Sequence, residues 1–188
     1  MPPCQGGRRG FESHPPLLIF PSGATMESSS MKLSDILNPG AVCADLQSTT
    51  KEQVIEELVG LLVSSEAIEK KYKNKIVEVL MAREALGSTA IGQGIAIPHG
   101  KTDSAKKLVG CIGISKKGIN FDSLDGEPAY IFFLLVAPVD SAGPHLKALA
   151  RISRLLKDKY IREILKSGKD EKTILKIIYQ EDGRLSKM

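Results

Sequence analysis

The sequence predicts an α/β fold in which one β-sheet is covered by helices on both faces. Stretches with apolar residues on one helical face alternate along the chain with short apolar runs. Two runs, 108–115 and 129–139, are apolar at odd and even positions alike, as strands buried on both faces are. A length of 188 residues suits one domain, or one domain with a tail.

Composition excludes several classes of protein. The net charge of +4 is mild and aromatic residues make up only 5%, whereas nucleic-acid surfaces combine dense basic patches with aromatics. No apolar run approaches the roughly 18 residues that a membrane span needs. The three cysteines are widely spaced and odd in number, which indicates neither a disulfide framework nor a metal knuckle. We therefore expect a cytoplasmic protein that binds no nucleic acid and does not insert into membranes.

Residues 1–30 differ in composition from the rest and are expected to lie outside the domain at 31–188. They are rich in Pro, Gly and Ser and lack periodicity. The pair Arg8-Arg9 fits a twin-arginine signal, but the apolar segment 17–20 is too short for one. We interpret this segment as a disordered leader, translated upstream sequence or a cloning remnant, and give His14 little functional weight.

Two helices are predicted in the first half of the domain. Thr50 and Gln53 have the spacing of a capping box, and the apolar residues that follow fall on one helical face. A second helix is predicted from about 69 to 84, with Gly87 ending it. Its inward stripe is read as Tyr72, Ile76, Val79 and Arg83, which places an arginine at the end of an apolar face.

Strands and helices alternate in the second half. Residues 92–100 indicate a short strand, and 108–115 and 129–139 two buried strands, the latter two separated by a turn at 125–128. A helix at 143–159 carries Pro144 in its first turn. Two further helices are expected at about 159–167 and 170–180.

The segment GIAIPHGK (94–101) places His99 between a proline and a glycine at the end of an apolar run. Pro98 is expected to end the pairing of the strand, and Gly100 to leave space around the imidazole. Such framing favours an accessible, reactive histidine over one buried in the core.

The other histidine of the domain, His145, heads the apolar stripe of the 143–159 helix and is expected to point toward the sheet. A helix start supplies free N–H groups and a positive dipole end, which suits an anion such as phosphate. The opposite side carries four basic residues, which we interpret as a solvated face rather than a surface for an acidic partner. These are Lys147, Arg151, Arg154 and Lys157.

Three chemistries remain open for the two histidines. They could bind a metal with Cys111 or Asp103, although no compact ligand spacing supports this. They could be ordinary core histidines. Together with Arg83 they also fit phosphoryl transfer, because a neutral imidazole is a competent nucleophile and a guanidinium matches phosphate oxygens. We expect no cofactor, since the sequence has no P-loop for a nucleotide, and no metal, since the ligand spacing does not support one.

At REALGSTAIGQGIAIPHGK (83–101) the chain resembles the enzyme IIA domains of the fructose–mannitol class of the bacterial phosphoenolpyruvate:sugar phosphotransferase system. The resemblance continues through 119–138 and 145–156 and covers essentially all of 31–182. Within the class, KLSDILNPGAV near the start and GSTAIGQGIAIPHGK look most like the nitrogen-regulatory branch. The resemblance implies a mixed sheet of about five strands with helices on both sides.

The resemblance also implies roles for individual residues. It makes His99 the phosphorylated nucleophile, and His145 and Arg83 its active-site companions. Thr89, Gly94 and Gly100 fall in the segment that shapes the pocket. Thr89 would donate its hydroxyl to phosphate, or it would be a turn or cap residue. Glu84 would orient Arg83 or a backbone amide, or lie on the surface.

Two classes of function follow from the resemblance. One is a phosphocarrier with a regulatory output, phosphorylated by phospho-HPr (or its nitrogen-branch counterpart) and then binding target proteins according to its phosphorylation state. The other is a sugar-specific IIA component that passes phosphate to a IIB domain for uptake. A domain with an incidental histidine would instead fail to become phosphorylated at all.

Overall fold

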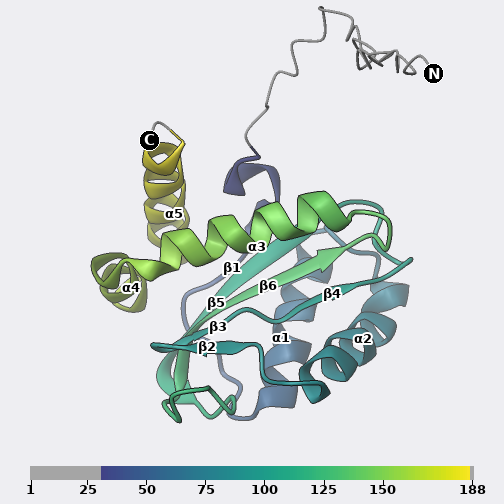
Figure 1. Ribbon diagram of the computed structural model, residues 1–188, viewed down its shortest axis with the longest axis horizontal. Coiled ribbons are helices and arrows are strands. Elements are labelled where there is room, and N and C mark those ends of the chain that lie inside the picture. Colours follow the sequence, from purple (N-terminus) through teal and green to yellow (C-terminus); the bar gives the residue numbers. More distant parts are fainter. Residues whose placement is uncertain (1–30, 187–188) are drawn as a thin grey trace, which may run out of the picture.

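The computed structural model describes residues 31–186, which form a six-stranded sheet between two layers of helices (Figure 1). Helices α1 and α2 cover one face, and α3, α4 and α5 cover the other. The helices are α1 (Lys51–Ser64), α2 (Lys73–Ala85), α3 (Ala142–Lys157), α4 (Lys159–Lys166) and α5 (Glu171–Leu185). The strands are β1 (Leu37–Cys43), β2 (Ala90–Gly92), β3 (Ile95–Ala96), β4 (His99–Lys101), β5 (Val109–Ile119) and β6 (Ala129–Ala137).

The sheet is mixed. Its order is β1-β5-β6-β3-β2, and β4 also pairs with β6. The central pair β5–β6 is antiparallel, whereas β1 runs parallel to β5, and β3 and β4 run parallel to β6. Because β3 and β4 share one edge of β6 in the same register, they form two parts of a single interrupted strand.

Each face of the sheet has its own apolar core. On β6, Phe132 and Leu134 pack toward α1 and α2, while Phe133 and Leu135 pack toward α3, α4 and α5. This alternation is what the period of two along a strand requires when both faces are covered. The α/β class and the mixed sheet are confirmed, with six strands rather than about five.

Strand β1 was not predicted from the sequence. Its residues, LNPGAVC, include a proline and a glycine, and their burial follows no alternation. The strand is irregular where it pairs with β5, between Leu37 and Val42. Its place in the sheet depends on pairing with β5, about 70 residues later in the chain. Local periodicity does not report such a distant partner.

The predicted helices are confirmed with shifted ends. Thr50 and Gln53 form the capping box of α1, with the Gln53 amide N–H donating to Thr50 Oγ1 at 3.3 Å. Helix α2 begins at Lys73 rather than about 69, after a 3-10 turn at Lys70–Tyr72. Across residues 31–186, every helix is too short or too polar to cross a membrane.

Candidate functional site

His99 is the first residue of β4, and its imidazole is half-buried. It pairs with Leu135, so its side chain lies on the face of the sheet covered by α3. The Nδ1 atom lies 2.7 Å from the carbonyl oxygen of Ile97. Because a carbonyl only accepts hydrogen bonds, Nδ1 carries the proton and Nε2 keeps a free lone pair.

Pro98 interrupts the pairing of the strand, as expected, but does not end it. The Pro98 carbonyl accepts from Leu135 N at 2.9 Å, and pairing with β6 resumes at His99 itself. Proline lacks only the N–H donor, so its carbonyl can still join the ladder of an outer strand. His99 is therefore held by regular strand pairing rather than presented on a loop.

Gly100 is buried and faces the opposite side of the sheet from His99. A Cβ at this position would lie 3.1 Å from Val79 Cγ1 and 3.3 Å from Leu80 Cδ2. The glycine therefore makes space for α2 to pack beneath the strand, rather than for a group that approaches the imidazole.

His145 lies beside His99, in the first turn of α3. The two ring centroids are 5.6 Å apart and the rings are inclined by 53°. The residue is 5% exposed and points toward the sheet, as predicted. Its Nδ1 is buried and has no hydrogen-bond partner among the described residues. Its backbone N–H already donates to Ser141 O, and Pro144 has none, so the helix start offers only the amides of Ala142 and Gly143 to a ligand.

The pKa values of both imidazoles lie below the ordinary value for histidine. Burial lowers the pKa of His99 below its ordinary value, and the nearby Arg83 charge lowers it further. Burial also lowers the pKa of His145, helped by His99 and Lys101. The site thus keeps a nucleophilic lone pair on His99 near neutral pH.

A pH titration should show this directly. Because both pKa values lie below the usual value of about 6.5, we expect the imidazole 15N signals of His99 and His145 to report neutral rings at pH 7. Protonation on the acid side should stabilise the unfolded chain more than the folded one, so the free energy of unfolding should decrease as pH falls below about 6.5. A midpoint above 6.5 for His99 would contradict the assignment of a neutral acceptor.

Arg83 occupies a different position on α2 from the one predicted. The buried row of the helix is Ile76, Leu80 and Glu84, spaced four residues apart. Arg83 lies beside this row and is partly exposed, with Nη1 donating to Gly87 O at 3.1 Å. The predicted stripe through Tyr72, Val79 and Arg83 therefore differs from the buried row. Residues three and four positions apart both lie on one helical face, so the spacing alone does not decide between them. Arg83 remains close enough to His99 for its charge to act on the imidazole.

Glu84 is 5% exposed, and its side-chain hydrogen bonds go to Lys51 and Thr89 rather than to Arg83. Its Oε2 accepts from Thr89 N at 2.9 Å and from Thr89 Oγ1 at 2.6 Å. Of the roles considered for Glu84, the structure shows the bond to a backbone amide and rules out a surface position. The hydroxyl proton of Thr89 is used by this bond, so the structure places it on Glu84 rather than toward the mouth of the site.

Gly94 lies away from His99. It has a φ of +76° in the turn between β2 and β3, and a Cβ there would be 3.1 Å from Tyr130 Cδ2. The strand runs on from Ile95 to His99 by four residues, or about 13 Å. The structure therefore brings together His99, His145, Arg83 and Gly100, but not Gly94.

Within residues 31–186, the candidate metal ligands Cys111 and Asp103 do not lie together with the two histidines. Cys111 belongs to the core against α1, on the face of the sheet opposite the two histidines. Asp103 forms an exposed ion pair with Lys75 at 2.7 Å. No group of three or more His, Cys, Asp or Glu that could hold a metal occurs in this part of the chain.

The sequence analysis did not predict two features of the site. The Ile97 carbonyl is a backbone group, and no residue type signals its role. Lys51, which donates to Glu84 Oε1 at 3.1 Å, did leave a signal. A lysine at the first position of a helix opposes the positive end of the helix dipole, so its presence indicates a specific partner.

Comparisons with known proteins identify the family of the chain. The family model for the phosphoenolpyruvate-dependent sugar phosphotransferase system, EIIA 2, matches residues 35–181. A "Nitrogen regulatory protein" of Bradyrhizobium diazoefficiens is 39% identical over 79% of this chain and 95% of its own length. The "PTS system fructose-specific EIIABC component" of Bacillus subtilis is 38% identical over 81% of this chain, which spans 24% of that longer protein.

The fold leads to the same family. The crystal structure of the nitrogen regulatory protein IIA-Ntr from Neisseria meningitidis superposes with a TM-score of 0.71 and 31% identity, covering 78% of this chain and 98% of that one. The chain thus belongs to the EIIA 2 family of the phosphoenolpyruvate-dependent sugar phosphotransferase system and is a phosphocarrier protein of that system.

Proposed function

We propose that Nε2 of His99 is the atom that receives the phosphoryl group, from a phosphorylated HPr-like donor. The observation that carries this proposal is the bond from Nδ1–H to Ile97 O, which leaves Nε2 as the free nucleophile on a neutral ring. The ring is held by strand β4 and is half-exposed, so a protein donor can reach it.

In the transfer step, the Nε2 lone pair of His99 forms a bond to phosphorus while the donor's nitrogen–phosphorus bond breaks. The donor's imidazole carries a proton on its other nitrogen, so that it takes back the electron pair of the broken bond and leaves as a neutral ring. The phosphorylated ring of His99 keeps its Nδ1 proton, and the Ile97 carbonyl stabilises the positive charge that develops on it. Since the group moves between two imidazole nitrogens, transfer in either direction needs no further source of energy.

Arg83 and His145 are the groups that hold the transferring phosphoryl oxygens in this proposal. Phosphoryl transfer depends mainly on positioning and on positive charge around the oxygens. Arg83 supplies a guanidinium that remains charged. His145 lies 5.6 Å from His99 between ring centroids, and its buried, unpartnered Nδ1 fits a residue that gains a bond when phosphate is present.

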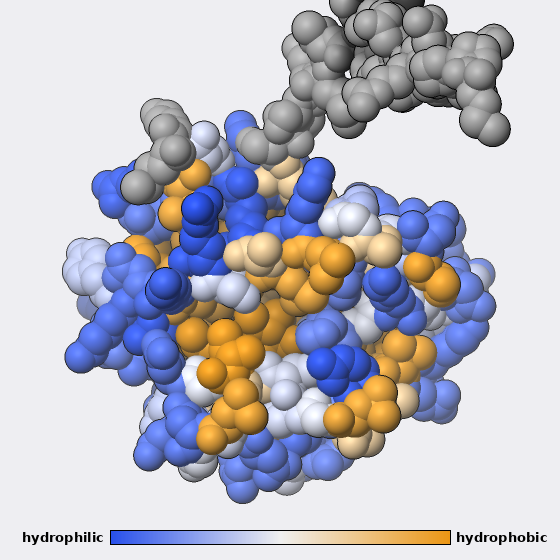
Figure 2. Space-filling view, viewed as in Figure 1, coloured by the Kyte–Doolittle hydropathy of each residue, from blue (hydrophilic) through white to orange (hydrophobic). Residues whose placement is uncertain are grey.

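Exposed apolar side chains provide contact area for a protein donor or acceptor near the site. Leu146 follows His145 on α3 and is 65% exposed, and Val139 precedes the helix and is 62% exposed. Figure 2 shows hydrophobic residues gathered in the middle of the face over which α3 runs. Such patches are typical of surfaces that bind other proteins.

We infer that the output of phosphorylation, in the cytoplasm, is regulatory. The similarity to nitrogen regulatory proteins extends over nearly their whole length. Phosphorylation adds roughly two negative charges beside Arg83 and Lys101, so a partner with an acidic face should bind the unphosphorylated form and be repelled by the other. The second candidate, transfer to a IIB domain for sugar uptake, is favoured by the similarity to the fructose-specific component.

The two outputs can be separated in one experiment. The phosphorylated protein and the His99→Ala variant are used in parallel to capture partners from native lysate, and the phosphorylated protein is also incubated with a fructose-type IIB domain. We expect one phosphorylation state to capture a non-transport protein selectively. Transfer to the IIB domain at the rate of sugar uptake, with no other partner, would contradict the regulatory proposal and support the transport one.

A further inference from the structure

A largely buried ion pair joins the first residue of α1 to the last turn of α2. Glu84 Oε1 accepts from Lys51 Nζ at 3.1 Å, and the Glu84 side chain is 3% exposed. Lys51 Nζ also donates to Asp122 Oδ2 at 2.7 Å. Burial alone would lower the pKa of Lys51, but the bonds to Asp122 and Glu84 outweigh it and raise the pKa, so the lysine stays charged.

The ion pair continues into a chain of hydrogen bonds that ends on His99. The second oxygen of Glu84 receives both the amide and the hydroxyl of Thr89. The carbonyl of Thr89 accepts from Ile97 N at 3.0 Å, and the carbonyl of Ile97 accepts from His99 Nδ1 at 2.7 Å. Within Thr89 and Ile97 the N–H and the C=O belong to successive peptide units joined through Cα, so the chain acts by fixing the positions of these groups relative to His99.

The Glu84 side chain also spans the turn that follows Arg83, through its two bonds to Thr89. Glu84 follows Arg83 on α2, and the turn closes with Gly87 N donating to Glu84 O at 3.1 Å. The Arg83 guanidinium in turn bonds Gly87 O. A change at Glu84 therefore acts on both the nucleophile and the arginine beside it.

The placement of these two charges opposes local helix stability. Lys51 stands at the positive end of α1 and Glu84 near the negative end of α2, so each is unfavourable for its own helix dipole. A buried ion pair contributes little to stability compared with well-packed apolar residues. Stability therefore does not explain why this ion pair is present, whereas a role in orienting the site does.

We propose that Glu84, held by Lys51, is a positioning residue for the phosphoryl transfer at His99, acting through Thr89 and the Ile97 peptide to fix the orientation and tautomer of the imidazole. The proposal rests on the proposed function in that His99 accepts the phosphoryl group. It assigns Thr89 to this chain of bonds rather than to direct contact with phosphate.

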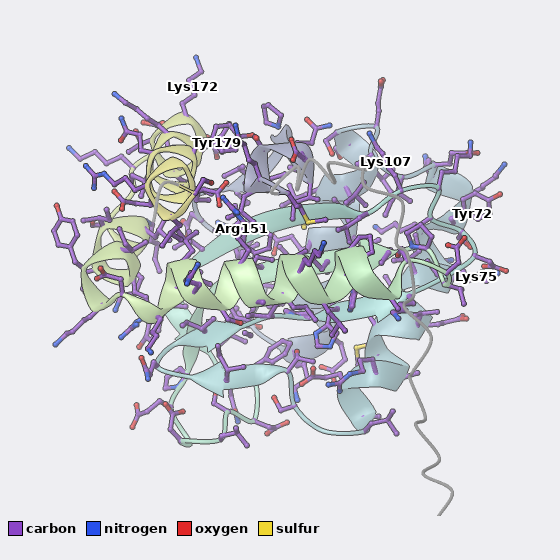
Figure 3. All side chains as sticks on the ribbon, turned by 45° about the horizontal axis from the view of Figure 1, so that its top comes forward. Tyr72, Lys75, Lys107, Arg151, Lys172 and Tyr179 are labelled. Atoms are coloured by element: carbon purple, nitrogen blue, oxygen red, sulfur yellow. The ribbon has the colours of Figure 1, made fainter. Side chains whose placement is uncertain are left out.

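The test compares Glu84→Gln with a matched control in the same protein. Arg151 and Asp182 form a second ion pair, on the other face of the sheet, with side chains exposed by the same 15% and 3% as Lys51 and Glu84. Arg151 projects from α3 on the side of α5 (Figure 3). Asp182→Asn therefore removes an equally buried charge far from the chain of bonds to His99 and reports the effect of a purely structural loss.

Two readouts are measured on each variant: the single-turnover rate of phosphorylation from phosphorylated HPr, and the imidazole 15N signals of His99 in the unphosphorylated protein. We expect Glu84→Gln to lower the rate by about 10²-fold, as a small misplacement of a reacting group does. We also expect the single Nδ1–H tautomer of the parent to become a mixture. Asp182→Asn should leave both readouts at the parent values.

Further variants keep the proposal testable if Glu84→Gln does not fold. Lys51→Met and Thr89→Val each remove one bond of the chain and should shift the tautomer in the same direction, with smaller losses of rate. The proposal would be overturned if the Glu84, Lys51 and Thr89 variants that fold kept the parent rate and tautomer. It would also be overturned if Asp182→Asn lost as much phosphorylation rate and tautomer purity as Glu84→Gln. The tautomer is read without phosphate, so failure of the parent to become phosphorylated would instead refute the proposed function alone.

Discussion

Replacement of His99 by alanine is expected to abolish acceptance of phosphate from phosphorylated HPr while leaving the fold intact. The variant loses the only nitrogen that combines a free lone pair with half-exposure in the described site. The neighbouring His145 is 5% exposed and cannot take over from its place at the start of α3. The measurement is transfer of radiolabel from HPr that has been phosphorylated with labelled phosphoenolpyruvate.

Two controls make the His99 result specific. The label on the parent should be lost in mild acid, as expected of a phosphoramidate and unlike a phosphate ester. The melting temperature of the variant should stay near that of the parent, because His99 lies at the edge of the core and makes one side-chain hydrogen bond. Label retained on the alanine variant would show that another residue is the acceptor.

Substitution of Arg83 or His145 by alanine should slow the transfer by about 10²–10³-fold rather than abolish it. Each variant removes one contact to the charge that develops on the phosphoryl oxygens, and single contacts of this kind contribute about that much to the rate. The rate is followed in single turnover with phosphorylated HPr in excess. The acceptor nitrogen of His99 remains in both variants, so the end point of labelling should equal that of the parent.

Arg83→Lys distinguishes charge from geometry in this pair. A lysine keeps the positive charge but not the planar fork that matches two phosphate oxygens, so an intermediate rate is expected. His145→Gln keeps a polar group of similar length and serves as the matching variant at the second position. Parent rates in both alanine variants would mean that neither residue contacts the phosphoryl group, despite the short distance between the imidazoles.

The sequence by itself determined the features that depend on neighbouring residues. Spacing within a single element was enough to predict the capping box at Thr50 and Gln53 and the two buried strands. It also predicted the inward stripe of α3 that begins at His145. The local pattern is sufficient for these because capping residues, the buried face of a helix and the two buried faces of a central strand each recur at a fixed spacing within the element. The inward direction of His145 was predictable for the same reason.

Only the tertiary structure decided the features that depend on residues distant in sequence. Strand β1 pairs with β5 across about 70 residues, and pairing resumes in β4 after Pro98 because β6 offers partners for the Pro98 carbonyl and for the residues that follow. Leu80 and Glu84 displaced the predicted stripe because the direction in which α2 faces the sheet is set by packing against Gly100. The link from Lys51 to His99 likewise joins α1, α2 and the strand edge, and hydrogen bonds between separate elements leave no periodic trace in the chain.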